Sequence, residues 1–338
     1  MPFEFLHLGK RWRPLGRLYE DERKVVIAFH DGFDHLAEFA DTFDFGKPTI
    51  VLFTCSWYVS AGQAAYYADI VRQALGGKNR TQMAAQRIVF VANSDAEFTN
   101  LRSAFPAGMV VRGNHAATLD ETQFVIAGAP KRHGAVLNAR PSPFKRHHLT
   151  RQVADKAFIS FLPKQLVNAP DRVNLDELAP QAIYWSAPTQ QVAEILDASR
   201  VGLMLSAIEG ACWASLEYLL CGLPVVSTPA RGGRDDFYDL ATARIVEDNE
   251  EQVALGVRAA LEDLDAGRLE SHEIRARTLR RLDAIRRALE RDLARTCERL
   301  GLGGLPDGWM FDHTAASAKL WSQINYWPTG FRVAPEEP

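Results

Sequence analysis

The sequence lacks several features that mark specialised classes of protein. Its four cysteines are scattered and form no C-x-x-C pair, so neither a disulfide framework nor a structural zinc site is expected. No run of about 18 apolar residues occurs, which argues against a membrane-spanning helix. The N-terminus, MPFEFLHLGKRWRPLG, has no long apolar core and no small-residue cleavage site, unlike a secretory signal. These absences predict a cytoplasmic protein and leave a peripheral membrane contact open.

A large net charge is also lacking. The 39 Lys and Arg residues against 42 Asp and Glu give a net charge of −3, which provides no general attraction to nucleic acid. We found no internal repeat and no low-complexity segment. At 338 residues the chain is too long for one ordinary hydrophobic core, so two domains are expected.

Short apolar runs rich in Val and Ile alternate with longer amphipathic stretches. This alternation is typical of an α/β protein whose parallel sheets are covered by helices on both faces. Helical spacing is found at 34–43 and 62–77. Strands are predicted at 24–29, 48–54, 87–93, 108–113, 122–128, 134–139, 156–162, 200–206, 224–228 and 243–247.

The last part of the chain has a different pattern. Residues 271–300 place leucines and isoleucines on one stripe among many arginines, which predicts one long amphipathic helix. The segment that follows contains Trp309, Trp321 and Trp327. So many large aromatic side chains predict a tail that docks on the body of the protein.

Two glutamates flank an otherwise apolar stretch, SAIEGACWASLEYLLCGLPVVSTPARGG. Glu209 follows directly after the predicted strand 200–206, at the end of a parallel sheet where ligands of α/β proteins bind. The next residues predict a helix, whose first N–H groups would favour an anion such as a diphosphate. Glu217 lies two turns along this helix. The two carboxylates therefore suit a ligand with hydroxyls at both ends and an anion between them, as in a nucleotide-sugar.

These residues resemble the E-x7-E signature of the retaining group 1 glycosyltransferases (family 4-like). Glu209, Glu217, the strand CGLPVVST and the glycine pair at 232–233 carry the resemblance. It implies the GT-B fold: two Rossmann-like domains that face each other across a cleft, with a long C-terminal helix. The corresponding division is an N-terminal domain 1–125, a nucleotide-sugar-binding domain 126–300, and a tail 301–338 that packs back on the N-terminal domain.

The resemblance also assigns roles to residues. Glu209 would contact the donor sugar and Glu217 the ribose hydroxyls. Arg140 and Lys145, in LNARPSPFKRHH, keep the five-residue separation of the family's phosphate-binding pair and would neutralise the leaving diphosphate. Further donor contacts are expected from Gly210, Ala211, Cys212, Gly232 and Gly233. The Asp235–Asp236 pair is not a D-x-D motif, so no metal and no other cofactor is expected.

Some positions depart from the family pattern. A glycine is usual where Ala139, Arg146 and Cys212 stand, and residues 1–23 contain no glycine-rich loop, which suggests a shortened N-terminal domain. The family's histidine after the strand 48–54 is also absent. His30, Asn114 and His115 are candidates for contacts with the donor or the acceptor.

The function implied is sugar transfer from a nucleotide-sugar to the hydroxyl of a carbohydrate, lipid-linked or other acceptor, in bacterial surface polysaccharide or glycoconjugate synthesis. A non-catalytic relative that binds a nucleotide-sugar or a partner enzyme remains an alternative. A third is another sugar-nucleotide enzyme on the same fold, such as an epimerase. The sequence names neither the nucleotide nor the sugar, and it leaves the oligomeric state open.

Overall fold

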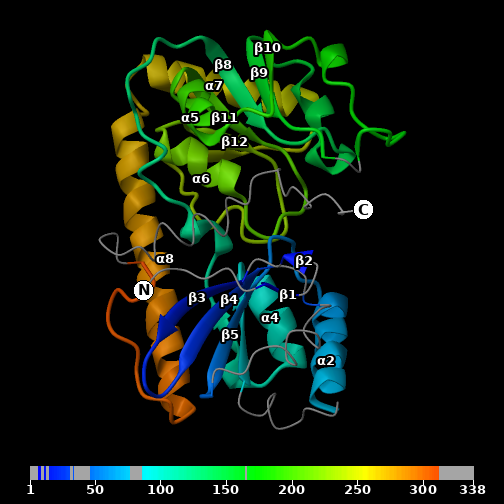
Figure 1. The fold of residues 1–338 in the computed structure, drawn as a ribbon. Coiled ribbons are helices and arrows are strands. Elements are labelled where there is room, and N and C mark those ends of the chain that lie inside the picture. Colours follow the sequence, from blue (N-terminus) through cyan, green and yellow to red (C-terminus); the bar gives the residue numbers. More distant parts are fainter. Residues whose placement is uncertain are drawn as a thin grey trace. The chain divides into compact units, whose positions relative to one another are not determined.

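The computed structural model describes residues 7–8, 11–12, 15–30, 33, 46–76, 86–163 and 166–311. The chain divides into two compact units, each with its own sheet (Figure 1). Unit 1 contains the described residues up to Leu119 and those from Ala284 onward, and unit 2 runs from Asp120 to Asp283. The sequence had placed these divisions at 125/126 and 300/301. The second division therefore falls inside a helix rather than after it.

Unit 1 is built on a five-stranded sheet with the order β3-β4-β5-β6-β7. Its strands are β3 (Leu15–Glu20), β4 (Val25–His30), β5 (Thr49–Thr54), β6 (Gln86–Ala92) and β7 (Val110–Arg112). All pairs are parallel except β3 with β4, which is antiparallel. The antiparallel β3, and the two-stranded pair of β1 (His7–Leu8) and β2 (Arg11–Trp12), were not predicted, because the residues before 24 have no apolar run.

Successive side chains of these strands point to opposite faces of the sheet, because a β-strand is pleated. One set, which includes Val51 and Phe53, packs against α2 (Ala61–Gly76) and α4 (Asp95–Ala104). The other set, which includes Ile50 and Leu52, packs against α8 (Ser271–Arg299) and residues 309–311. Two short 3₁₀ helices, η2 (Ala107–Met109) and η3 (His115–Thr118), flank β7.

Unit 2 is built on a six-stranded sheet in which every neighbouring pair is parallel. The order is β10-β9-β8-β11-β12-β13. Its strands are β8 (His133–Asn138), β9 (Lys156–Ser160), β10 (Ala182–Trp185), β11 (Ser199–Met204), β12 (Val225–Ser227) and β13 (Ala243–Ile245). Its longer helices are α5 (Thr189–Asp197), α6 (Trp213–Leu220) and α7 (Glu250–Asp265).

The two faces of the central strand β11 are covered by different helices. Val201 and Leu203 share a buried cluster with residues of α7. Gly202, which points the other way, lies against the ring of Tyr218 on α6, and a Cβ atom there would overlap that ring. The glycine therefore lets α6 approach the sheet closely, at the edge where Glu217 is placed.

The long helix was predicted at 271–300 and is observed as α8 (Ser271–Arg299). Its stripe of Ile274, Leu282, Leu289 and Leu293 is buried. None of the helices in the described part of the chain is long and apolar enough to cross a bilayer. Residues 301–311 continue unit 1, where Trp309 packs against Tyr19 with ring centroids 6.0 Å apart. The rest of the predicted tail, 312–338, lies outside the described residues.

The strand expected at 122–128 is wrong: these residues form turns and extended chain without a strand partner, and the Asp197 carboxylate accepts from the N–H groups of Ala127 and Ala129 (3.1 and 2.8 Å). The apolar run thus follows α5 rather than entering the sheet. The helix expected at 34–43 lies outside the described residues.

Candidate functional site

The candidate site of unit 2 is formed where β8, β11 and β12 end. Arg140 and Lys145 follow β8, Glu209 follows β11, and the glycine pair follows β12. These three strands are neighbours in a parallel sheet, so their carboxyl ends meet at one edge. The short 3₁₀ helices η4 (Pro143–Lys145) and η5 (His147–Thr150) follow β8 and shape the first loop.

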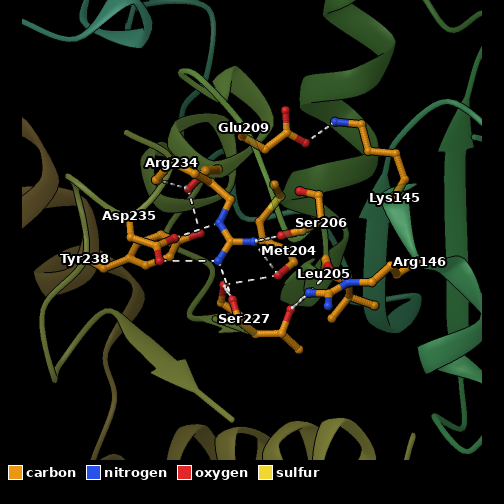
Figure 2. A network of polar contacts seen from close by, with 12 residues as sticks. Lys145, Arg146, Met204, Leu205, Ser206, Glu209, Ser227, Arg234, Asp235 and Tyr238 are labelled. Carbon is orange, nitrogen blue, oxygen red and sulfur yellow. Dashed lines mark hydrogen bonds and ion pairs between the residues drawn. The ribbon is translucent and has the colours of Figure 1, made fainter. Parts of the chain in front are cut away.

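Lys145 and Glu209 are brought together by this arrangement. The Lys145 Nζ atom donates to Glu209 Oε1 in an ion pair, which Figure 2 shows at the mouth of the sheet. Glu209 is 6% exposed. Arg140 Cζ and Lys145 Nζ both lie 5.1 Å from the centroid of the Phe144 ring, so both cations contact the same aromatic side chain. Burial lowers the pKa of Arg140, whereas the charge of Glu209 opposes that shift.

Glu209 lies on a short two-chain ladder, which we call the second ladder: residues 207–210 paired with residues 231–233. Arg231 N–H donates to the carbonyl of Ala207 (2.9 Å), and Glu209 N–H donates to that of Arg231 (3.0 Å). Gly233 N–H then donates to the carbonyl of Gly210. Gly232 has φ +112°, and a Cβ atom there would overlap the carbonyl oxygen of Glu209. The close approach expected of the glycine pair is therefore an approach to the Glu209 backbone.

Glu217 lies on α6 and is 6% exposed. Its carboxylate accepts a hydrogen bond from the side-chain amide of Asn138, at the end of β8 (3.1 Å). The N–H of Asn138 donates to the hydroxyl of Tyr218, the next residue of the helix (2.6 Å). Asn138 thus links the end of β8 to both side chains. The sequence analysis missed it, because an asparagine at a strand end is common in loops of every kind.

The N-terminus of α6 lies beside Glu209 in the chain. Its N-cap residue, Cys212, makes no side-chain capping hydrogen bond. Burial raises the pKa of the Cys212 thiol to about 11, so the side chain is a neutral thiol at pH 7. Ala211 is buried beside it. An N-terminus without a side-chain cap leaves first-turn N–H groups for other acceptors.

Arg146 explains one departure from the family pattern. It has φ 53° and ψ 40°, the left-handed conformation for which glycine is preferred. Its guanidinium donates to the carbonyl of Leu205, to Thr228 Oγ1 (2.6 Å) and to Asp248 Oδ2 (2.9 Å). These contacts join the loop after β8 to the ends of β11 and β12, and they offset the cost of a non-glycine residue in this conformation.

Arg146 variants should therefore show an unusual order of stability. We expect both Arg146→Gly and Arg146→Ala to be less stable than the wild type, because both lose the three contacts. Arg146→Ala should be the less stable by about 1 kcal/mol, since alanine retains the cost of the left-handed conformation. Urea unfolding of the three proteins measures this order. An alanine variant as stable as the glycine variant would contradict it.

Arg234 is a second arginine that the sequence analysis missed. It is 1% exposed, and its guanidinium donates to the carbonyls of Met204, Ser206 and Thr228 and to Asp235 (Figure 2). Burial acts to lower the pKa of Arg234, but Tyr238 and Asp235 outweigh it, so the pKa is raised. The only signal in the sequence is an arginine directly after a glycine pair and before an acid, which alone is indistinguishable from a surface loop.

The other predicted contacts lie in unit 1. His30 is the last residue of β4. Asn114 caps η3, where its side chain accepts from the N–H of Ala116 (2.9 Å). The N–H of His115 donates to the side-chain oxygen of Asn93 (2.8 Å). Asn114 and His115 are both buried. Contacts of these residues with a donor or an acceptor stay predictions.

Among the residues that the structure describes, no group of three or more His, Cys, Asp and Glu side chains is placed to hold a metal ion. Asp235 pairs with Arg234 at 2.7 Å, which gives this acid a partner within the protein. The expectation that no metal is needed stays a prediction.

Comparison with known proteins gives a family match in this same unit. Residues 177–276 match the family described as glycosyl transferases group 1, a segment that includes Glu209, Glu217 and the glycine pair. Comparison with curated protein sequences gives no match.

Solved structures match over most of the chain. The Anabaena protein HepE in complex with UDP-glucose is 16% identical, with a TM-score of 0.55 and coverage of 81% of this chain and 78% of that one. A glycosyltransferase from Rickettsia africae is 14% identical, with a TM-score of 0.54 and coverage of 79% and 80%. Sucrose-phosphate synthase from Thermosynechococcus elongatus is 15% identical, with a TM-score of 0.52 and coverage of 80% and 79%. At these identities the similarity shows the fold.

The fold is therefore that of the GT-B glycosyltransferases: mixed α/β, with largely parallel sheets. Within this fold, residues 177–276 of unit 2 match the group 1 glycosyltransferase family.

Proposed function

We propose that this chain transfers a sugar from a nucleoside diphosphate sugar to an acceptor hydroxyl with retention of the anomeric configuration. UDP-sugars are the first candidates for the donor, because the Anabaena structure contains UDP-glucose. The observation that carries the proposal is the ion pair of Lys145 with Glu209 at the carboxyl edge of the unit 2 sheet. In the chain, Glu209 lies shortly before Cys212, the N-cap of α6.

Each part of the donor has a matching group in this site. Arg140 and Lys145 supply positive charge for the diphosphate, together with the first-turn N–H groups of α6. Glu209 faces the sugar end and Glu217 the ribose end. Asn138 orients the carboxylate of Glu217 through its side-chain amide. An ionised carboxylate only accepts hydrogen bonds, so each of the two glutamates can accept from the hydroxyls of the sugar or of the ribose.

The chemical step breaks the bond between the anomeric carbon and the diphosphate oxygen, and forms a bond from that carbon to the acceptor oxygen. The acceptor proton passes to the leaving diphosphate. Negative charge grows on the diphosphate as its bond breaks, and Lys145 and Arg140 stabilise this charge. When the diphosphate engages Lys145, that side chain exchanges part of its ion pair with Glu209 for the phosphate, which frees the Glu209 carboxylate for the sugar. The step needs no protein nucleophile.

The acceptor is a hydroxyl of a carbohydrate, lipid-linked or other molecule. Synthesis of a bacterial surface polysaccharide or glycoconjugate is the pathway that we propose. The reducing interior of the cell is the location that goes with it, since this is where nucleotide-sugars are used by such enzymes.

A thermal-shift screen against UDP, GDP, ADP and dTDP, with and without their glucose derivatives, tests the proposal. We expect one nucleotide to raise the melting temperature, because a ligand that binds only the folded state stabilises it by mass action. Glu217→Ala should lose this shift at the same ligand concentration, since the ribose contact is removed. We expect its affinity to fall about 30-fold, the equivalent of about 2 kcal/mol.

The control is Glu251→Ala, a change of an exposed carboxylate at the start of α7 in the same unit. It should keep the full shift. If no nucleotide stabilised the wild type, the chain would be a non-catalytic relative. If the Glu217→Ala protein kept the wild-type affinity, the ribose assignment would be wrong. Product analysis then separates a transferase from an epimerase, because only transfer consumes an acceptor.

A further inference from the structure

The Arg234 side chain lies in a gap between two pairs of hydrogen-bonded segments of the chain. The first pair is the end of the sheet, where β11 and β12 are parallel partners up to Met204 and Ser227. The last bond of this pair is from Thr228 N–H to the Met204 carbonyl (3.2 Å). The second pair is the second ladder, which begins where Arg231 donates to Ala207. Between them the two chains have no backbone hydrogen bond to each other among those described.

The guanidinium of Arg234 takes the place of the missing backbone bonds. It donates to the carbonyls of Met204 (3.3 Å) and Ser206 (2.6 Å) on one chain, and to that of Thr228 on the other. The planar fork of a guanidinium suits this task, because its five donors point outward in fixed directions. Asp235 accepts from the same group (2.7 Å) and balances the buried charge.

Because Arg234 is buried, its hydrogen bonds constrain the separation of the two segments. A guanidinium that is 1% exposed must find partners for its donors, since an unsatisfied buried donor is costly. The three carbonyls can satisfy it only while the two chains keep their separation. Arg234 therefore fixes the distance between the chains at the point where they leave the sheet.

The second ladder carries Glu209 beyond this point. Its position relative to the sheet depends on the contacts that span the gap. Arg234 bonds to backbone carbonyls of both segments there (Figure 2). Thr228 Oγ1, which donates to the Leu205 carbonyl (3.1 Å), and Arg146, which bonds to both of these residues, span the same gap near the loop after β8. Glu217 and Asn138, by contrast, lie on α6 and β8 and bond to each other. The hydrogen bond from Ser215 Oγ on α6 to Arg234 (3.3 Å) is accepted by the backbone carbonyl of Arg234, which a side-chain substitution retains. A change at Arg234 should therefore act on the sugar end of the donor and spare the nucleotide end.

We propose that Arg234 is a positioning residue of the transfer reaction, which holds the carboxylate of Glu209 against Lys145 and the donor sugar by bridging the chains that leave β11 and β12. This inference rests on the proposed function. It separates two tasks within one site: Asn138 orients the nucleotide end, and Arg234 orients the sugar end.

The test compares Arg234→Lys and Arg234→Met with the wild type in two measurements. The first is the affinity for UDP alone, by calorimetric titration. The second is the rate of UDP release from UDP-glucose, with water or an added sugar as acceptor. If the thermal-shift screen selects another nucleotide, that diphosphate and its sugar replace these probes. Arg258→Met, an exposed arginine on α7, is the matched control.

We expect UDP affinity within about 3-fold of the wild type in both variants, and UDP release lowered about 100-fold in Arg234→Met. Arg234→Lys should recover part of this loss, because a lysine keeps the charge and can reach some of the carbonyls but cannot bridge all of them. Arg258→Met should match the wild type in both measurements. If Arg234→Met does not fold, the lysine variant carries the comparison with an expected loss of about 10-fold.

A purely structural role predicts a different result, in which UDP affinity and UDP release fall together. That result, or unchanged UDP release in both variants, would overturn the inference while leaving the proposed function in place. If the wild-type protein bound no nucleoside diphosphate, the proposed function would be overturned, and the inference with it.

Discussion

Replacing Lys145 by alanine is expected to lower the rate of sugar transfer about 1,000-fold while the chain stays folded. The Nζ atom pairs with Glu209 and shares the Phe144 ring with Arg140, so it lies where the negative charge of a leaving diphosphate would develop. A group that stabilises charge in the transition state typically contributes a factor of about 10² to 10³. The affinity for the donor should fall much less, because Arg140 and the N-terminus of α6 remain. UDP release from UDP-glucose measures the rate.

Two controls separate chemistry from stability. Lys145→Ala leaves the carboxylate of Glu209, which is 6% exposed, without its lysine partner, and this costs stability. Adding Glu209→Gln to the same variant should recover stability without recovering activity. Arg151→Ala removes an exposed cation six residues away, whose pair with Glu250 is worth little. It should be fully active. A Lys145→Ala enzyme with the wild-type rate would rule out the phosphate-site assignment.

Gly232→Ala should have the second large effect, a loss of activity of at least about 100-fold with a clear loss of stability. The added Cβ would overlap the carbonyl oxygen of Glu209, and alanine does not readily adopt φ +112°. The chain can relieve this overlap only by separating the second ladder, which moves Glu209 away from Lys145. We expect a cost of about 3 kcal/mol in folding free energy from the strain and the overlap together.

Gly267→Ala is the matched control for this change. Gly267 also has a positive φ, of 67°, but no atom lies within 4 Å of the Cβ that it would acquire. Gly267→Ala should lose only about 1 kcal/mol of stability, because alanine is disfavoured at a positive φ, and it should keep its activity. The difference between the two variants, measured by urea unfolding and UDP release, reports the contact with Glu209 together with the greater backbone strain of alanine at φ +112°. Equal effects of the two changes would show that the contact has no role.

Periodicity in the sequence predicted the elements that have strong patterns. Runs of Val and Ile marked the central strands, and the spacing of Ile274, Leu282 and Leu289 marked α8. Among the strands that were missed are β3 and β10, each at one edge of its sheet. β3 mixes apolar and polar residues and so has little apolar signal, and β10 has only four residues, too few for a pattern. The run at 122–128 was misread for the opposite reason, since it is apolar but forms no strand, and the N–H of Ala127 in this run donates to Asp197 of α5.

The sequence by itself determined the class of fold and placed four charged residues of the candidate site in one region: Arg140, Lys145, Glu209 and Glu217. Glu209 and Glu217 could be placed because ligands of parallel α/β sheets bind where strands end, which makes position along the chain a guide to position in space. Arg140 and Lys145 were assigned through the resemblance of LNARPSPFKRHH to the phosphate-binding loop of the glycosyltransferase family. Only the tertiary structure decided which groups hold these side chains. Asn138 donates to the carboxylate of Glu217, and Arg146 and Arg234 donate to backbone carbonyls of segments distant in sequence. Such contacts depend on how strands pair and where loops leave the sheet, and no local pattern of residues encodes that geometry.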